Sequence, residues 1–512
     1  MPSNDWYYED YREDIWNEFN LFWKIMWVKD MDYSSLTFLF LLPFAVGIYF
    51  GIPDRFKYIW LLILSYLFCF SWGTRAVIFL AVVTIFSYGA GLLIEYFDKK
   101  RRIKRVVFIL GILACIGFWI FSKGSTLLFR SQIETIESFL ILPVGISFYS
   151  LQAVGYLTDI YKGKEAAEHN FFKVALYLAF FPKFVSGPLE KSSFFFAQLN
   201  NIHNKKFQYE TVKNGILLMM WGYLQKLLIA DKLLIPVNEI YDNWQMYSGT
   251  MICIGTILFA VQLYADFGGY TCIALGIGEI LGIELHNNFK QPYLADSVKD
   301  FWRRWHISLS GWLREYIYIP LGGNRKGRLC KCRNILLTFV VSGFWHGTSW
   351  RFIVWGMLHG IYQIMGEVCN PLRNKVYKIL HINSNNKICA VWKKMCVFIL
   401  VDIAWLFFRA DGLKTALQML YKCVEDIQFA NILKKLFFLG LKAEEVYIVL
   451  GAMAILVLVD ILHEKNIEIR KWLSNQNIAL RWGCYLSVAF VLIIAMMGEI
   501  GGTATQFVYA QF

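Results

Sequence analysis

The sequence predicts an all-α, polytopic membrane protein with roughly 11–13 transmembrane or re-entrant helices. Of its 512 residues, 57% are hydrophobic and 17% charged, whereas soluble proteins average about 45–50% apolar and 25% charged residues. Apolar runs that are long enough to cross a hydrocarbon core of about 30 Å recur along the whole chain. The bilayer core offers the backbone no water to bond, so each run is expected to be a helix that spans the membrane or re-enters it.

Residues 1–30 differ from the rest of the chain and precede the first apolar run. They lack a basic segment followed by an apolar one, so they are not interpreted as a signal peptide. Their mixture of acidic and aromatic residues is typical of an amphipathic segment at the membrane surface, or of sequence outside the core. We expect a single transmembrane domain over residues 31–512, with its core beginning at Met31.

The apolar runs follow one another with short polar connections. The longest polar stretches, about residues 200–209 and 370–387, are too short to fold alone. No fixed-period repeat is visible, which counts modestly against a secondary transporter, because many transporters are built from related halves. The expected spans begin near Leu36, Tyr58, Ala76, Val106, Phe139, Phe171, Val212, Met251, Asn334, Phe352, Met395, Val446 and Trp482.

The distribution of charge predicts the topology. The chain carries 51 Lys and Arg against 38 Asp and Glu, a net charge of +13. The densest basic clusters are residues 98–105 and 324–333, and cytoplasmic loops are enriched in Lys and Arg, so both clusters are predicted to be cytoplasmic. Counting spans back from the first cluster places the N-terminus outside. These short basic loops indicate topology, and no nucleic-acid partner is expected.

The eleven cysteines are scattered along the chain. Cys330 and Cys332 fall in a loop predicted to be cytoplasmic, so reduced thiols are expected. This CxC pair has neither a second pair nor nearby histidines, so no metal site is predicted.

Asp266 lies in the strongly apolar segment VQLYADFGGY, with two glycines directly behind it. A carboxylate at membrane depth is costly unless it is paired or functional, so Asp266 needs a partner. It either orients a histidine or binds a polar group of a substrate, or else it makes a structural bond between helices. The sequence favours neither alternative.

Two histidines inside aromatic-rich, apolar sequence give the strongest functional signal: His306 in FWRRWHISLSGWL and His346 in SGFWHGTSW. Imidazole titrates near neutrality and can take a proton from a hydroxyl nucleophile. His359 is interpreted as a packing or supporting histidine. Five further histidines fall in loops or at span ends and are expected to be solvated: His169, His203, His286, His381 and His463.

Arginine and aromatic residues alternate around His306. This density is typical of the lipid headgroup zone, where indoles and guanidinium groups meet the glycerol and phosphate groups. The alternative is a positively lined entrance for an acidic carrier or a phosphopantetheine group. The turn at residues 320–327 lacks the spacing of a phosphate-binding P-loop, and no GxSxG elbow for a serine nucleophile occurs. The alternating residues are Trp302, Arg303, Arg304, Trp305, Trp312, Arg314 and Tyr316.

Taken together, these motifs resemble the bacterial branch of the membrane-bound O-acyltransferase (MBOAT) family. The resemblance rests on VQLYADFGGYTC, DFWRRWHISLSGWLREYIYIPLGGNRKG and SGFWHGTSW, supported by LPVGISFYSLQAVGYLTDIY, FFPKFVSGPLE and the terminal FVYAQF. It spans nearly everything from Met31 to Phe512 and is strongest with the group of alginate O-acetyltransferase membrane subunits and their peptidoglycan and cellulose counterparts. The chain departs from the family pattern at Ala265 and Gly268, where the pattern has Cys and Ser.

The resemblance implies the MBOAT fold in the bacterial cell membrane. It also implies that an acyl group passes from a cytoplasmic thioester through a tunnel to the outer face. It places catalysis at His346, with His306 as the second functional position and Asp266, Trp305 and Trp345 as possible supporting residues.

The resemblance further implies substrates and partners. No tightly bound cofactor is expected, and acetyl-CoA or an acyl carrier protein would be the donor substrate. The acceptor would be a polysaccharide, reached directly or through an extracytoplasmic acetyltransferase of the SGNH type, with membrane lipid around the protein. The alternatives are D-alanyl transfer to teichoic acid and a non-enzymatic polysaccharide transporter or export scaffold.

Overall fold

The computed structural model describes residues 31–33, 35–128, 145–381, 383, 386–430, 432 and 439–498. Over these residues the chain is helical and contains no β-strand, which confirms the predicted all-α class. The N-terminal segment of residues 1–30, the start of the span expected near residue 139 and the terminal FVYAQF lie outside the described residues. The continuation of that span, Ile146–Tyr161, is described and is helical.

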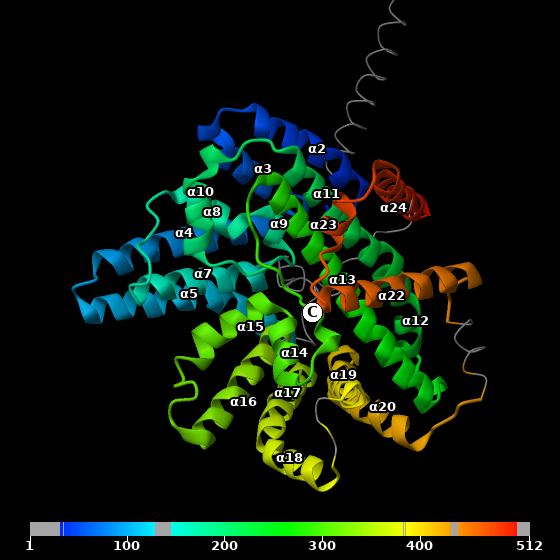
Figure 1. Ribbon diagram of the computed structural model, residues 1–512. Helices are drawn as coiled ribbons and strands as arrows, with labels where there is room; N and C mark the ends of the chain where they lie inside the picture. The colour runs from blue at the N-terminus through cyan, green and yellow to red at the C-terminus, as the bar shows by residue number, and fades with distance from the viewer. Residues whose placement is uncertain are drawn as a thin grey trace, which may run out of the picture.

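The helices of the first half run from the blue to the green part of Figure 1. Each has an apolar stretch matching an expected span, or connects two of them. They are α2 (Leu36–Gly51), α3 (Lys57–Ser71), α4 (Thr74–Tyr96), α5 (Arg101–Leu128), α7 (Ile146–Tyr161), α8 (Phe171–Ala179), α9 (Phe181–Phe184), α10 (Ser192–Asn200), α11 (Tyr209–Tyr223), α12 (Asp231–Asp242) and α13 (Gly249–Leu281).

The second half continues from green to red. It comprises α14 (Val298–Arg304), α15 (Ile307–Leu313), α16 (Gly327–His346), α17 (Trp350–Val368), α18 (Asn370–Ile379), α19 (Lys387–Arg409), α20 (Leu413–Glu425), α22 (Ala443–Glu464), α23 (Ile469–Ser474) and α24 (Ile478–Gly498). The span expected from Phe171 is only the 9-residue helix α8, which at about 1.5 Å per residue is too short to cross a bilayer.

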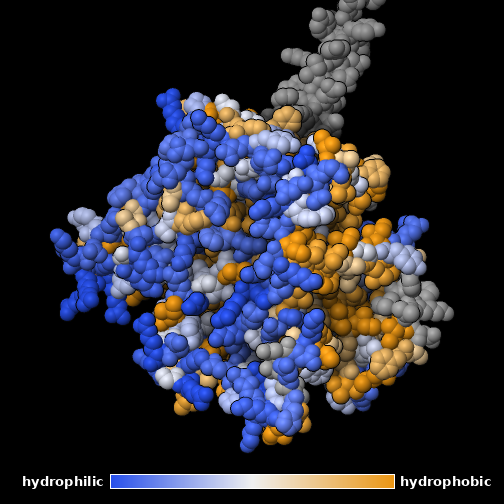
Figure 2. Space-filling view, in the orientation of Figure 1, coloured by the Kyte–Doolittle hydropathy of each residue, from blue (hydrophilic) through white to orange (hydrophobic). Residues whose placement is uncertain are grey.

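Four of the described helices are long and apolar enough to cross a membrane: α4, α13, α22 and α24. In α13, 72% of the apolar window is buried inside the protein, against 11% in α22 and 6% in α24. The central helix is therefore α13, whereas α22 and α24 present most of their apolar surface to lipid. Figure 2 shows hydrophobic residues gathered on the side of α12 and α22, beside a largely hydrophilic front.

Glycines allow α11 to pack closely against α13. A Cβ at Gly215 would lie 2.6 Å from the Gly276 carbonyl oxygen, and one at Gly222 would lie 2.5 Å from that of Gly269. Each pair is seven residues from the next, so the small residues follow one face of each helix. Small residues at such positions let transmembrane backbones approach. Beyond this contact, α11 continues through a π-helical segment, η3 (Leu224–Ala230), into α12.

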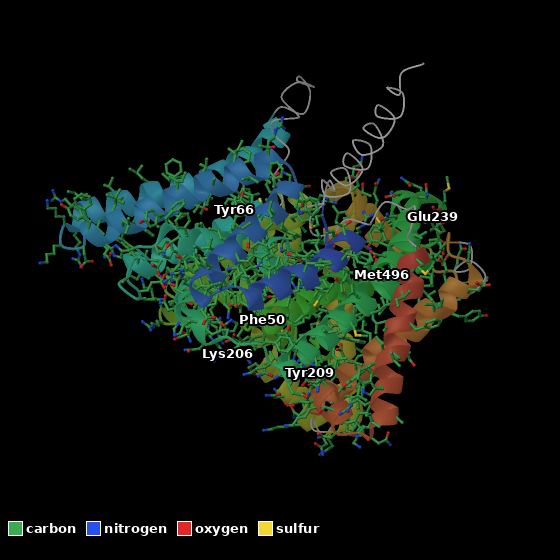
Figure 3. All side chains as sticks on the ribbon, turned by 90° about the horizontal axis from the view of Figure 1, so that it is seen from above. Phe50, Tyr66, Lys206, Tyr209, Glu239 and Met496 are labelled. Carbon is green, nitrogen blue, oxygen red and sulfur yellow. The ribbon has the colours of Figure 1, made fainter. Side chains whose placement is uncertain are left out.

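The two basic clusters lie toward the same face of the protein. Lys104, in the first cluster, packs over the ring of Tyr161 at the end of α7. Lys164, three residues after Tyr161, pairs with Glu315 in η6 (Arg314–Tyr318). This π-helical segment leads into the second cluster. In Figure 3, Lys206 and Tyr209 lie toward one face and Glu239 toward the other.

Candidate functional site

His306 occupies the junction between α14 and α15 with a left-handed backbone, φ 45° and ψ 54°. This conformation is uncommon for a residue with a side chain and often marks a functional position. The junction is bonded to the preceding loop: the amide of Ile307 donates to the carbonyl of Asn288 at 3.0 Å. The Ser308 hydroxyl donates to the side-chain oxygen of the fully buried Asn288 at 2.7 Å. These two hydrogen bonds to the preceding loop therefore fix the backbone at His306.

The His306 ring is buried, with 1% of the residue exposed. Its centroid lies 4.7 Å from that of Phe267 on α13, edge to face. Phe148 on α7 lies at 6.4 Å and Trp345 on α16 at 6.1 Å. The predicted functional histidine thus sits where α7, α13 and α16 meet.

His346 is the last residue of α16 and is 4% exposed. Its ring lies 5.0 Å from Trp355 and 5.2 Å from Phe408. The turn into α17 is tight, since a Cβ at Gly347 would lie 2.3 Å from the ring of Phe352. The GFWHG motif therefore ends a helix inside the protein and leaves the imidazole among aromatic rings.

Trp345 is the shared neighbour of the two histidines. Its ring lies 6.1 Å from His306 and 4.7 Å from His346. Its indole Nε1 donates to the carbonyl of Ser147 at 3.1 Å. Trp305 does not contact either ring in this way. It packs on Phe289 at 5.0 Å and on Trp405 at 5.1 Å, and these three rings form the aromatic cluster behind His306.

Asp266 is fully buried and forms an ion pair with Lys226 of η3, Nζ to Oδ1 3.0 Å. The same Nζ lies 2.7 Å from Oδ1 of Asp231 and 5.4 Å from the ring centroid of Tyr270. The Tyr270 hydroxyl donates in turn to Asp32, just before α2. Asp266 therefore has the partner that the sequence required. The ion pair links α13 to η3. The sequence analysis did not single out Lys226, although WGYLQKLLIAD places its charge inside an apolar run.

His359 lies on α17 and is fully buried among aromatic rings. Trp302 lies 5.0 Å away and Trp355 5.1 Å away, both edge to face. Because Trp355 also contacts His346, His359 supports the packing around that residue, in agreement with the packing role predicted for it.

A cavity of about 720 Å³ opens beside α15, η6 and α16. Arg303 and Arg314 line it, as the sequence suggested for a positive entrance, but Arg304 does not. Arg304 pairs with Asp300 at 2.8 Å and with Glu464 at 2.6 Å. The remaining basic residues in the lining are Lys299, Arg325 and Lys331.

The cavity extends to Ser342, a buried residue one helical turn before His346. Trp302 lines it too and is 8% exposed, while Trp305 is 1% exposed. The headgroup-zone interpretation is therefore wrong for these two indoles, which pack inside the protein. Trp312, partly buried, donates to the carbonyl of Leu151 at 3.0 Å.

The five remaining histidines are exposed, as expected from their places in loops or at span ends. One of them has a strong partner: His286 Nδ1 lies 2.6 Å from the buried carboxylate of Glu190. This hydrogen bond raises the pKa of His286 above its usual value, outside the spanning helices.

A model of the membrane-bound O-acyltransferase family matches residues 161–408, which include His306, His346 and Asp266. The chain is 34% identical over 399 residues to a probable alginate O-acetylase of Pseudomonas aeruginosa, covering 76% of this chain and 74% of the relative. It is 33% identical over 396 residues to the peptidoglycan O-acetyltransferase of Helicobacter pylori, covering 71% and 73%. A teichoic acid D-alanyltransferase of Streptococcus thermophilus is 26% identical over 349 residues, covering 64% and 80%.

Proposed function

Because this chain belongs to the membrane-bound O-acyltransferase family and is a multi-pass O-acyltransferase of the bacterial cell membrane, we propose that it moves acetyl groups from a cytoplasmic thioester toward a cell-surface polysaccharide. The observation that carries this proposal is the pair of buried histidines that share Trp345. Dry surroundings protect a thioester from hydrolysis and still leave an imidazole available as a base.

In the proposed reaction, the oxygen of an acceptor hydroxyl attacks the thioester carbonyl while His346 takes the proton from that hydroxyl. The new ester C–O bond forms, the C–S bond breaks, and the proton passes to the departing thiolate. His306 holds the second position, with its ring centroid 6.1 Å from that of Trp345. General-base catalysis of this kind contributes about 10²–10⁴-fold in rate.

The donor is proposed to enter through the basic cavity beside α15. Phosphate groups of acetyl-CoA, or the phosphopantetheine of an acyl carrier protein, would lie against Arg303 and Arg314. Arginine suits this task because its planar fork bonds phosphate oxygens in pairs. The thioester end would point toward Ser342 and His346. The thioester is a substrate, and no tightly bound cofactor is proposed.

Acetyl is favoured over D-alanyl because the relatives named as acetylases are more similar to this chain than the D-alanyltransferase of Streptococcus thermophilus. The polymer that receives the acetyl group is proposed to be a polysaccharide, as the names of the relatives say of those proteins. An extracytoplasmic acetyltransferase of the SGNH type is proposed as the partner that completes the transfer.

The test uses inverted membrane vesicles supplied with acetyl-CoA, or with carrier protein, labelled in the acetyl group. Label should move into polymer or partner protein, and His346→Ala should stop it. Label transfer from a D-alanyl carrier but not from an acetyl donor would contradict the proposal, and no transfer from any thioester would favour a transporter.

The donor route has its own test. Arg303→Gln with Arg314→Gln should raise KM for the donor several-fold and change kcat little. Arg328→Gln is the matched control, because Arg328 is exposed on α16 and does not line the cavity. An equal change in KM for both variants would contradict donor entry at this cavity.

A further inference from the structure

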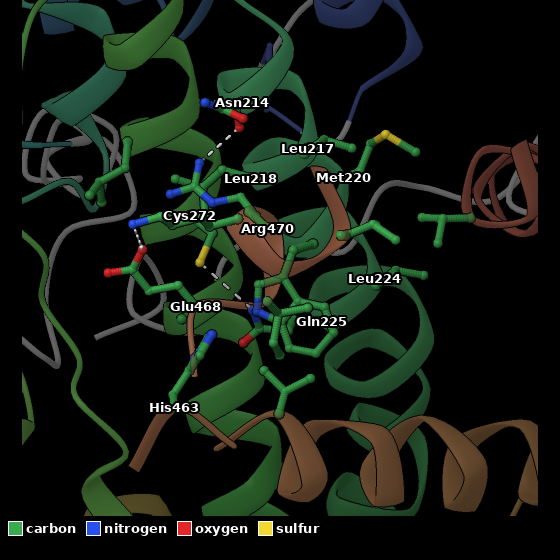
Figure 4. Close-up of a pocket in the computed structure, with 18 of the residues that line it drawn as sticks. Asn214, Leu217, Leu218, Met220, Leu224, Gln225, Cys272, His463, Glu468 and Arg470 are labelled. Atoms are coloured by element: carbon green, nitrogen blue, oxygen red, sulfur yellow. Dashed lines mark hydrogen bonds and ion pairs between the residues drawn. The ribbon is translucent and has the colours of Figure 1, made fainter. Parts of the chain in front are cut away.

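A second cavity, of about 670 Å³, lies between the core helices α11 and α13 and the C-terminal helices α22, α23 and α24 (Figure 4). Tyr264 and Phe289 form part of its wall. Both rings also pack on Trp305, at 6.2 Å and 5.0 Å, so they separate the cavity from the aromatic cluster behind His306. The C-terminal wall lies beyond residues 161–408, the range matched by the family model.

The cavity is amphiphilic along its length. Figure 4 shows Leu217, Met220 and Leu224 on one side, and Glu468 and Arg470 at one end. The charged end faces the same side as Tyr209, because Arg470 donates to the carbonyl of Asn214 one turn further along α11. Away from Arg470 the lining is mostly apolar, and the Asp460 carboxylate there accepts a hydrogen bond from Tyr264 at 3.0 Å. A mostly apolar channel whose exposed charges lie at one end has the shape of a lipid chain and its headgroup.

Two walls of the cavity are helices that face the bilayer. Only 11% of the apolar window of α22 and 6% of that of α24 are buried. A dry apolar space costs free energy in proportion to its volume, because its lining loses contact atoms. Next to lipid, an acyl chain is the apolar group available to fill it.

The charged end carries both signs. Arg470 Nη1 donates to Asn214 and to Glu279 at 3.0 Å, so its other N–H groups remain available as donors. Lys471 and Glu468 lie 4.0 Å apart with 77% and 75% of their side chains exposed. Such a loosely paired end fits a headgroup that carries both a phosphate and an ammonium.

A buried hydroxyl adds a separate indication. The hydroxyl of Tyr485 on α24 has no hydrogen-bond partner among the described residues, and the side chain lines the cavity. Buried hydroxyls are nearly always bonded. An ester carbonyl at the base of a lipid headgroup would accept its proton.

From these features we propose that the cavity holds one aminophospholipid. One acyl chain lies along Leu224 and Val488, the phosphate accepts hydrogen bonds from Arg470, and the ammonium lies near Glu468. The lipid thereby ties α22 and α24 to the core. This site is independent of the donor cavity, on the other side of the aromatic cluster.

The test compares two substitutions on neighbouring positions of α24 in the full-length protein, purified in detergent. Cys484→Phe fills the cavity, which Cys484 lines. Gly483→Phe is the matched control, because a Cβ there meets nothing within 4 Å. Added phosphatidylethanolamine should raise the Tm of the wild type and of Gly483→Phe by several degrees, and that of Cys484→Phe much less. An equal rise in all three proteins would overturn the proposal.

Native mass spectrometry gives a second readout that does not depend on thermal stability. The wild type should retain one phosphatidylethanolamine, and Arg470→Gln should lose most of it, whereas Arg481→Gln, outside the cavity lining, should keep it. Retention of phosphatidylglycerol in preference to phosphatidylethanolamine would overturn the headgroup assignment. If Cys484→Phe does not fold, Cys484→Leu replaces it, with the same expected loss of bound lipid.

Discussion

The indole Nε1 of Trp345 donates a 3.1 Å hydrogen bond to the carbonyl oxygen of Ser147. This bond joins the end of α16 to the beginning of α7 and sets the plane of the Trp345 ring, which contacts both His306 and His346. The relative placement of the two histidines therefore depends on a contact between two residues that lie 198 positions apart in the sequence.

Trp345→Phe should lower kcat by about 5-fold, since a lost hydrogen bond of this kind is worth about 1 kcal/mol and the ring can then rotate. Acyl transfer at equal membrane expression is the measurement. Trp392→Phe on the exposed surface of α19 is the control and should have no effect. Unchanged kcat in Trp345→Phe would show that the bond does not position the site.

His346→Ala and His346→Gln should both abolish acyl transfer and leave the protein folded. Loss of a general base costs about 10²–10⁴-fold in rate, and an amide cannot take up the proton near neutral pH. Activity is measured relative to protein level in membranes, with the exposed His381→Gln as control. If His346→Gln transfers acetyl normally, general-base catalysis by this residue is wrong.

His306→Asn separates the backbone from the ring. Asn tolerates the left-handed conformation better than most residues, so the fold should survive, while activity should fall severely. His306→Ala should lose the same activity and also some stability, because alanine is strained at φ 45°. Tm and acyl transfer are measured side by side; full activity of His306→Asn would mean that only the backbone shape matters.

Lys226→Met should destabilise the protein strongly. Breaking a buried ion pair costs about 3–5 kcal/mol because a charge is left buried, and here both Asp231 and Asp266 lose the same ammonium. Lys213→Met, which breaks a surface pair with Glu210, should change stability by about 0–1 kcal/mol. Fluorescence-detected size-exclusion after heating measures both, and equal melting of the two variants would contradict this account.

Cys330 and Cys332 lie in the first turns of α16, not in the loop expected from the sequence. This end of α16 should be cytoplasmic. In a background without the other cysteines, an impermeant thiol reagent should label these two residues only after the cells are opened. Their thiols are free and partly exposed, so the reagent can reach them. Labelling from outside intact cells would reverse the topology and the side on which the donor enters.

Local patterns in the sequence determined the helical class, the places of most spans and the two histidines of interest. Apolar run length and the cost of unbonded backbone in lipid act within each segment, so a single chain reveals them. The same cost explains why His306 and His346 stood out. It also explains why the sequence by itself requires a partner for Asp266.

The tertiary structure decided which partners meet. Lys226 reaches Asp266 from a π-helical segment 40 positions earlier, and Arg304 leaves the positive entrance to pair with Glu464 on α22. Hydrogen bonds from Ile307 and Ser308 to Asn288 hold the junction at which His306 adopts a left-handed backbone. Each of these contacts depends on how helices pack against one another, through glycine approaches such as Gly222 on Gly269. Packing of this kind leaves no local period in the sequence, whereas burial and helical length do.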